Sequence, residues 1–262
     1  MSFSIAVADK GGCGKTTPAA LVVRCLKRHD FTPILAIDAD PNQDFGESLG
    51  LEVGQTVGGT IAGFNGEKNG LPSGMTKEAY LEFRLNETLV ESRGLDLLTM
   101  GRGQGDDCYC DPNMVLRKFA DSLLHSYSYM VMDNEAGMEH LSRRTTDNVD
   151  VLLLVANHSV KGVRAVARIA ELAKELRLRV GREMVVINNV PGHLDALLEE
   201  EMVRLHVEPA ALIPEEDLIE RFDFERRSLL DLPDDSPAVL AADRLTTQIL
   251  SRELTTNRRE KE

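Results

Sequence analysis

The sequence predicts an α/β fold with one doubly wound, mainly parallel sheet of about seven strands and helices on both faces. Three observations lead to this. Short apolar runs rich in Val, Ile and Leu alternate with amphipathic stretches, which is typical of buried parallel strands joined by helical crossovers. The chain has 262 residues, 42% of them hydrophobic, enough for a sizeable core. A Gly-rich segment follows the first apolar run and precedes a helical stretch. We expect a single domain over residues 1–262.

The predicted elements follow one another in regular alternation. The expected strands are Phe3 to Ala8, Pro33 to Asp38, Leu95 to Met100, Tyr129 to Asp133, Val151 to Ala156, Met184 to Asn188 and Ala210 to Ile213. The expected helices are Lys15 to His29, Lys77 to Val90, Asn113 to His125, Lys161 to Leu176 and His193 to His206. A last helix begins at Ser236-Pro237, a hydroxyl that can cap it and a proline suited to its first turn. Gly54 to Thr76 has no clear period, which predicts an irregular, mobile excursion.

Composition and charge exclude several classes of protein. Thirty basic and 43 acidic residues give a net charge of -13, and the Lys and Arg form no basic patch, so duplex nucleic acid is not an expected partner. No apolar run approaches the roughly 20 residues of a spanning helix, and the N-terminus does not resemble a signal peptide. We therefore expect a cytoplasmic protein without membrane partners. Four cysteines are too few for a disulfide framework, so any special one is a ligand or a reactive thiol.

A phosphate-binding loop is predicted directly after the first strand, where the chain reads Lys10-Gly11-Gly12-Cys13-Gly14-Lys15-Thr16-Thr17. Backbone N–H groups of a Gly-rich turn and the positive end of the following helix form a concave site for a polyphosphate. Lys15 would reach the β- and γ-phosphates, and the Thr16 hydroxyl would bind Mg²⁺. The general pattern has glycine where this chain has Asp9. A carboxylate there repels a triphosphate, so we expect Asp9 to disfavour nucleotide binding.

Acidic residues end two further predicted strands. Asp38 and Asp40 lie at i and i+2, on one side of an extended chain. Asp40 is the candidate to orient or deprotonate an attacking water, and Asp38 to act through Mg²⁺ or its waters. Asp133 ends the fourth strand and is the candidate acid that holds Mg²⁺ through water, while Gly137 permits a backbone turn near the γ-phosphate.

The nucleotide base is expected across the carboxyl edge of the sheet, where doubly wound folds bind ligands. Asn188 follows an apolar strand there and has an amide that can pair with an adenine edge; Asn189 is a competing candidate. Pro214 begins the loop after the next strand and is a candidate wall for the base.

Cys108 and Cys110 form a Cys-x-Cys pair near a predicted helix start, where thiols ionise more easily. Thiolates suit Zn²⁺ or Ni²⁺, and residue types do not distinguish the two ions. A closed tetrahedral site needs four ligands, which two chains about a twofold axis would supply. Cys13 lies within the phosphate-binding loop and Cys25 within a predicted helix, and both are expected to be spacers or core residues and not ligands.

The two-lysine loop resembles the deviant Walker A motif of the MinD, ParA and nitrogenase iron protein class of P-loop NTPases. In that class the residue matching Lys10 reaches the partner's nucleotide across a dimer. Together with Asp38 to Asn42, the Cys-x-Cys pair and Asp133 to Thr145, the loop is similar to CooC-type nickel-insertion ATPases of carbon monoxide dehydrogenase. The resemblance extends over nearly the whole chain.

The resemblance implies a homodimer that closes around ATP and Mg²⁺, with Lys10, Lys15 and Asp40 as its catalytic residues. Asn188 would read the base, as the matching Asn does in these ATPases. Cys108 and Cys110 of both chains would bind one nickel or zinc ion, and ATP hydrolysis would drive transfer of nickel to carbon monoxide dehydrogenase.

Other classes share parts of this pattern. A nickel-insertion factor for acetyl-CoA synthase would look much the same. A metal carrier with weak or no ATP turnover is a further alternative, in which Asp9 has weakened the use of nucleotide. A positioning ATPase should carry a basic membrane or DNA surface, which the charge does not support. An electron carrier should space its cluster cysteines far apart, which the close pair does not match.

Overall fold

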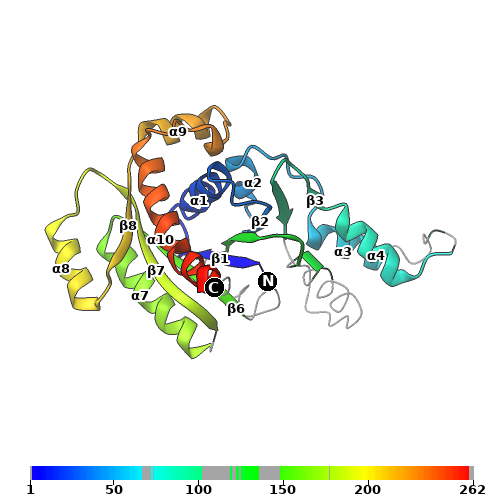
Figure 1. Ribbon diagram of the computed structural model, residues 1–262, viewed down its shortest axis with the longest axis horizontal. Helices are drawn as coiled ribbons and strands as arrows, with labels where there is room; N and C mark the ends of the chain where they lie inside the picture. The colour runs from blue at the N-terminus through cyan, green and yellow to red at the C-terminus, as the bar shows by residue number, and fades with distance from the viewer. Residues whose placement is uncertain are drawn as a thin grey trace.

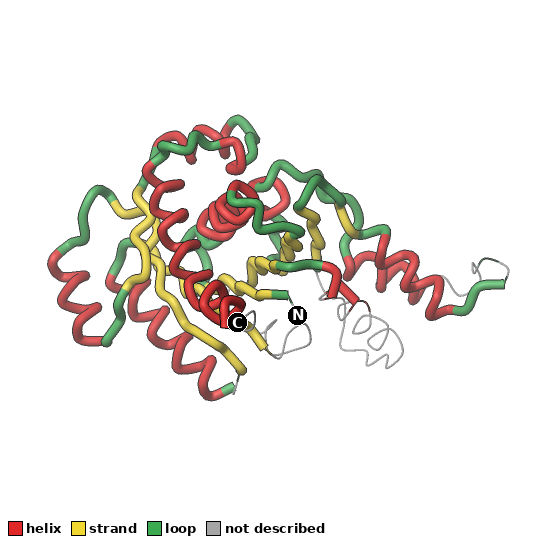
Figure 2. The backbone as a smooth tube through the Cα atoms, viewed as in Figure 1, coloured by secondary structure: helices red, strands yellow, loops and turns green. Residues whose placement is uncertain are grey.

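The computed structural model describes residues 2–66, 72, 74–101, 119, 122–123, 125–135, 148–176 and 178–259. Its strands are β1 Phe3–Ala8, β2 Ile34–Ala39, β3 Leu89–Val90, β4 Leu95–Thr99, β5 Tyr129–Asn134, β6 Asn148–Asn157, β7 Arg179–Val190 and β8 Pro209–Pro214. Its helices are α1 Thr16–Arg28, α2 Asp44–Ser48, α3 Val57–Gly66, α4 Lys77–Asn86, α7 Val160–Glu175, α8 Ala196–Leu205, α9 Asp217–Phe224, the 3-10 turn η1 Leu229–Asp231 and α10 Pro237–Arg259. The strands form one sheet between helices (Figures 1 and 2).

The described strands form an eight-stranded sheet in the order β3-β4-β2-β5-β1-β6-β7-β8. Every neighbouring pair is parallel except β3 with β4. The register places Asp133 opposite both Val7 of β1 and Asp38 of β2. The predicted α/β class with a mainly parallel sheet is therefore confirmed, and the carboxyl ends of three central strands bring the predicted acidic residues together.

Alternate residues of each central strand pack into two separate cores, as the period of two requires. Ile5 and Val7 of β1 belong to a core with α1 and α10. Ala6 and Ala8 belong to a second core with α7 and α8. Because both faces of β1 are covered, its end is held firmly where the phosphate-binding loop begins.

In two segments the structure has a different type of element from the one predicted. The helix predicted from Lys77 to Val90 ends at Asn86, and Leu89–Val90 forms the short antiparallel strand β3. This strand is additional to the seven that were predicted. Gly54 to Thr76 is not irregular throughout, because α3 occupies Val57–Gly66. Its four glycines are poor helix formers, but Val57 and Thr60 are buried and Ile61 and Phe64 pack on the second core. Tertiary packing therefore overrides local propensity.

The C-terminal helix α10 is fastened at its first turn. The Ser236 hydroxyl donates to Glu216 Oε2 at 2.7 Å, and the Ala238 N–H donates to the same oxygen at 3.1 Å. The predicted start of this helix is confirmed, with a carboxylate from the start of α9 as an additional cap.

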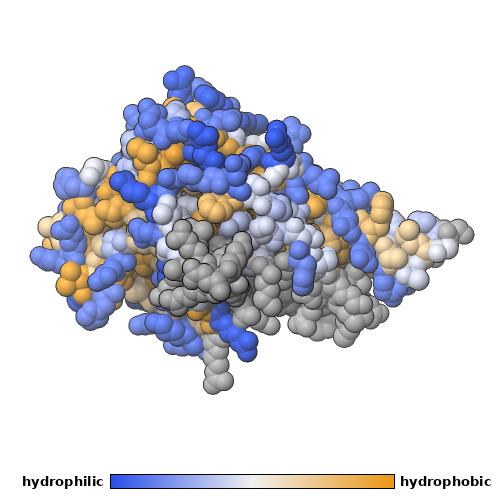
Figure 3. Space-filling view, in the orientation of Figure 1, coloured by the Kyte–Doolittle hydropathy of each residue, from blue (hydrophilic) through white to orange (hydrophobic). Residues whose placement is uncertain are grey.

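Hydrophilic residues cover much of the face in Figure 3, and hydrophobic residues are interspersed among them. The most exposed large apolar side chains include Leu197 and Val203 of α8 and Phe224 of α9. None of the helices in the described ranges has the length and apolar character required to span a bilayer.

Gly46 of α2 lies where a side chain has no room. A Cβ atom there would stand 2.7 Å from Val53 Cγ2 and 2.9 Å from Leu97 Cδ2. We expect Gly46→Ala to lower the free energy of unfolding by about 1–3 kcal/mol, as overpacking does. Gly54→Ala, where nothing lies within 4 Å, is the control and should leave it nearly unchanged. Urea denaturation compares the two, and equal stability would show that the α2 region adjusts freely.

Candidate functional site

The segment after β1 folds as a tight loop that leads into α1. Gly11, Gly12 and Gly14 have φ angles of 96°, 72° and 72°, a region that favours glycine. Among the described residues, the N–H groups of Gly12 and Gly14 and those at the start of α1, from Lys15 to Thr17, have no hydrogen-bond acceptor. Such a row of free N–H groups at a helix N-terminus suits an anion.

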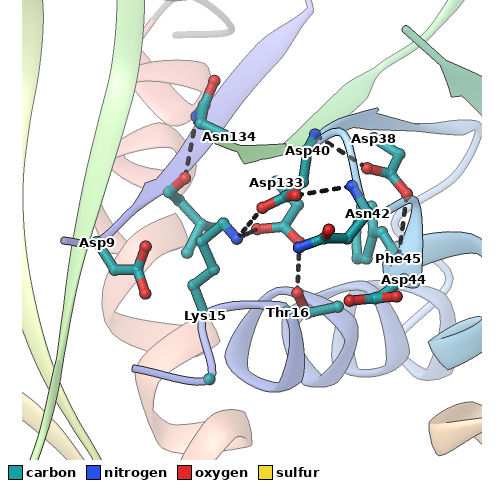
Figure 4. A network of polar contacts seen from close by, with 12 residues as sticks. Asp9, Lys15, Thr16, Asp38, Asp40, Asn42, Asp44, Phe45, Asp133 and Asn134 are labelled. Carbon is teal, nitrogen blue, oxygen red and sulfur yellow. Dashed lines mark hydrogen bonds and ion pairs between the residues drawn. The ribbon is translucent and has the colours of Figure 1, made fainter. Parts of the chain in front are cut away.

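Lys15 and Thr16, at the end of this loop, reach two carboxylates (Figure 4). Lys15 Nζ lies 2.5 Å from Asp40 Oδ2 and 3.9 Å from Asp133 Oδ1. The Thr16 hydroxyl donates to Asp133 Oδ2 at 2.6 Å. The structure thus brings together four of the predicted site residues from three segments of the chain.

Asp38 is fully buried and holds the turn after β2. Its Oδ1 accepts the Asp40 N–H at 3.1 Å, and its Oδ2 accepts the Phe45 N–H at 3.0 Å. Asp40 in turn accepts the Asn42 N–H at 2.9 Å. In this arrangement Asp38 shapes the turn that presents Asp40 to Lys15, while its carboxylate lies in the same network as Asp133.

Burial and mutual repulsion shift the pKa values of these acids upwards. Burial, aided by the Asp38 and Asp40 carboxylates, raises the pKa of Asp133 to about 7 against the opposing effects of Lys15 and Thr16. Burial, aided by Asp40, raises the pKa of Asp38 to about 6. Burial alone would lower the pKa of Lys15, but the carboxylates of Asp133, Asp40 and Asp9 together raise it. Lys15 is therefore held in its charged form beside acids that ionise reluctantly.

Three buried side-chain oxygens around the loop lack a hydrogen-bond partner within the described residues: Asp133 Oδ1, Asn134 Oδ1 and Asn188 Oδ1. Unsatisfied buried polar atoms are rare and costly, and they are often found where a ligand or ion completes a site. The other oxygen of the Asp133 carboxylate, Oδ2, accepts a hydrogen bond from the Thr16 hydroxyl, and oxygen atoms of this kind are the ligands Mg²⁺ prefers. The donor set therefore fits a magnesium ion bound with a nucleotide.

A cavity of about 390 Å³ adjoins the loop. Its lining comprises Gly14, Thr16, Thr17, Asp44, Glu47, Ser48, Asn189, Glu215, Glu216, Ile219, Glu220, Asp223, Arg226, Arg227 and Leu229. This volume is within the range of small-molecule sites. The α9 residues were not anticipated because this helix was not predicted; the acidic run after Pro214 was the available signal.

The two asparagines at the end of β7 differ in position. Asn188 is buried, and its Nδ2 donates to the loop carbonyls of Cys13 at 3.2 Å and Gly14 at 3.1 Å. Asn189 lines the cavity. Pro214 ends β8 opposite Val190 and stands one residue before the cavity-lining Glu215.

The remaining predicted residues are divided between surface, core and undescribed segments. Lys10 is exposed, whereas Cys13 and Cys25 are buried, and burial raises the pKa of Cys25 to about 12. Cys108 and Cys110 lie outside the described residues, as does Gly137. Within the residues that are described, no group of three or more His, Cys, Asp and Glu side chains is placed to hold a metal ion.

The raised pKa of Asp133 predicts a pH-dependent cost in stability. An unfolded aspartate ionises near pH 4, so the cost is absent there and grows as pH rises to about 7. We expect Asp133→Asn without nucleotide to raise the free energy of unfolding by about 2 kcal/mol at pH 8, with a smaller gain at pH 5. Urea denaturation at both pH values measures this difference.

Asp234 is the control of opposite sign. Hydrogen bonds from Arg28 and Arg24 lower the pKa of Asp234 to about 2. Asp234→Asn should therefore reduce stability at pH 8. An Asp133→Asn variant that is less stable than the wild type at pH 8 would contradict the assigned burial cost.

Comparisons with known proteins agree with this geometry. Residues 4–229 match the CobQ/CobB/MinD/ParA nucleotide binding domain. The chain is 36% identical over 250 residues to an uncharacterised ATP-binding protein of Methanocaldococcus jannaschii, covering 95% of this chain and 98% of that protein. It is 28% identical over 188 residues to the carbon monoxide dehydrogenase accessory protein CooC of Rhodospirillum rubrum, covering 68% and 71%.

A solved chain of the MinC:MinD cell division protein complex of Aquifex aeolicus shares the fold, with a TM-score of 0.69 at 22% identity, covering 95% of this chain and 96% of that one. The family match spans the sheet, the loop after β1 and the acidic strand ends. The chain therefore belongs to the CobQ/CobB/MinD/ParA nucleotide-binding domain family.

Proposed function

We propose that this protein is an ATPase that binds ATP with Mg²⁺ at the loop after β1 and uses its hydrolysis in the maturation of a nickel enzyme. The observation that carries the nucleotide site is the convergence of free loop N–H groups, Lys15 and the Thr16–Asp133 pair at one edge of the sheet. The N–H groups and Lys15 would bind the phosphates. Mg²⁺, held by Thr16 and through Asp133, would neutralise the charge that develops on them.

The ion pair between Lys15 and Asp40 would break during the reaction. The ammonium group of Lys15 binds the Asp40 carboxylate at 2.5 Å. Phosphate oxygens compete for the same ammonium group, and Asp40 is then released to accept a proton from, or orient, the attacking water. Asp38 supports this role because it fixes the turn that carries Asp40.

The base would lie in the cavity beside the loop. Asn189 and Glu215 line this cavity, and Pro214 directly precedes Glu215 in the chain. Asn188 Oδ1 is buried and unpartnered among the described residues, so it is suited to accept a hydrogen bond from an exocyclic amino group such as that of adenine. Asn188 would in this way connect the base to the loop carbonyls that its own amide nitrogen holds.

The nickel role rests on the similarity to CooC and on the Cys108–Cys110 pair. We propose a homodimer in which these cysteines of both chains bind one nickel or zinc ion, with Lys10 contacting the partner's nucleotide. Carbon monoxide dehydrogenase is the proposed client, and acetyl-CoA synthase the alternative. If nucleotide and metal both favour the closed dimer, each raises the affinity for the other.

The shared metal site predicts coupled changes in mass and metal content. With Mg²⁺ and a non-hydrolysable ATP analogue, we expect light scattering to show a dimer that holds about one Ni²⁺ or Zn²⁺ per two chains. Cys108→Ser/Cys110→Ser should lose the metal. Cys25→Ala, which removes a buried thiol of α1, is the control, and this variant should keep the bound metal. Metal binding that does not change with nucleotide would favour a simple metal carrier. If the double variant binds as much metal as the wild type, the proposed cysteine site is wrong.

Lys10 provides a second test of the dimer. It is exposed and stands at the front of the loop, so it is available to a partner chain. Lys10→Ala should abolish nucleotide-driven dimerisation and reduce ATP hydrolysis, while binding of Mg·ADP by the monomer persists. Lys161→Ala, on the exposed side of α7, is the matched control. An unchanged dimer in Lys10→Ala would remove this residue from the interface.

A further inference from the structure

Asp9, the residue that stands in place of the usual glycine, points into the loop and not toward solvent. It is fully buried at the end of β1. Its Oδ1 accepts the Gly11 N–H at 2.9 Å, and its Oδ2 accepts the Cys13 N–H at 3.0 Å. Both carboxylate oxygens are thus engaged by the backbone of the phosphate-binding loop itself.

The same part of the loop is also held by Asn188. Its amide nitrogen donates to the carbonyls of Cys13 and Gly14. Cys13 is consequently fixed at its N–H by the end of β1 and at its carbonyl by the end of β7. Gly14 is confined as well, because a Cβ atom there would lie 2.8 Å from Asn188 Nδ2.

Asp9 binds alternate N–H groups of the loop and leaves others unoccupied. Gly12 and Gly14, and then Lys15 to Thr17, have N–H groups without an acceptor among the described residues. The carboxylate therefore fixes the loop while keeping free the N–H groups at the start of α1, where a phosphate would bind.

We propose that Asp9 is a positioning residue that holds the phosphate-binding loop in its binding conformation before nucleotide arrives. This inference rests on the proposed nucleotide site. A Gly-rich segment loses much conformational freedom when it becomes ordered, and a binding site that is ordered in advance avoids that loss on binding. Hydrogen bonds to a charged acceptor are stronger than neutral ones, so one side chain is sufficient.

The charge of Asp9 is compensated within the site. Its carboxylate accepts two N–H groups and lies near enough to Lys15 to contribute to the raised pKa of that ammonium group. The sequence alone indicated repulsion between Asp9 and a triphosphate. The structure instead directs the carboxylate to the loop backbone, which assigns it a supporting role.

Hydrogen exchange of the nucleotide-free protein tests the proposal directly. Asp9→Gly removes both acceptors, and Asp9→Asn preserves the shape but retains only one acceptor oxygen. We expect the Gly11 and Cys13 amides to exchange about tenfold faster or more in Asp9→Gly, with a smaller increase in Asp9→Asn. Asp150→Asn is the control: this carboxylate holds the Ser4 N–H and hydroxyl at the other end of β1. Asp150→Asn should leave the exchange rates of the Gly11 and Cys13 amides unchanged.

Calorimetric titration with Mg·ADP provides the second measurement. We expect about tenfold weaker binding by Asp9→Gly and an intermediate affinity for Asp9→Asn, which also serves if the glycine variant does not fold. Unchanged exchange, or tighter Mg·ADP binding by either variant, would overturn the proposal and make Asp9 a competitor of phosphate. If the wild type itself binds no Mg·ADP, the proposed nucleotide site fails, while exchange in the free protein still reports on Asp9.

Discussion

The site depends on the ion pair between Lys15 and the carboxylates around it. Asp40 and Asp133 reach the ammonium group from two different strand ends, and Asp9 acts on it from a third. Buried carboxylates are unfavourable without a positive partner, and here a single buried lysine serves several. The loop, the turn after β2 and the end of β5 thus place carboxylates around one ammonium group.

Strand register makes this convergence unavoidable. β1, β2 and β5 are adjacent and parallel, and Asp133 is in register with Asp38 and with Val7 near the start of the loop. Asn134 adds a side-chain link, because its Nδ2 donates to the Val7 carbonyl at 3.0 Å. The sheet therefore sets the distances between the phosphate-binding loop and the acids, and the helices mainly protect the two cores.

Much of the fold and of the site could be predicted because the sequence patterns that indicate them are local. Apolar runs marked seven of the strands, and the glycines with Lys15 and Thr16 marked the loop. The two-residue strand β3 was too short for any period, and glycine-rich α3 forms because it packs on the second core. Side-chain direction was equally hidden: the residue type at Asp9 indicated repulsion of phosphate, whereas its contacts are with the Gly11 and Cys13 N–H groups. Asn188 was predicted to read a base, but its hold on the loop carbonyls follows only from the proximity of β7 and the loop.

Glu216 gives the cavity a connection to the far end of the chain. Glu216 lines the cavity beside the loop, and its Oε2 accepts hydrogen bonds from the Ser236 hydroxyl and the Ala238 N–H at the first turn of α10. The helix that this carboxylate caps packs on α1 along the first core. One residue of the cavity lining therefore also stabilises the start of the C-terminal helix, which ties the two ends of this segment together.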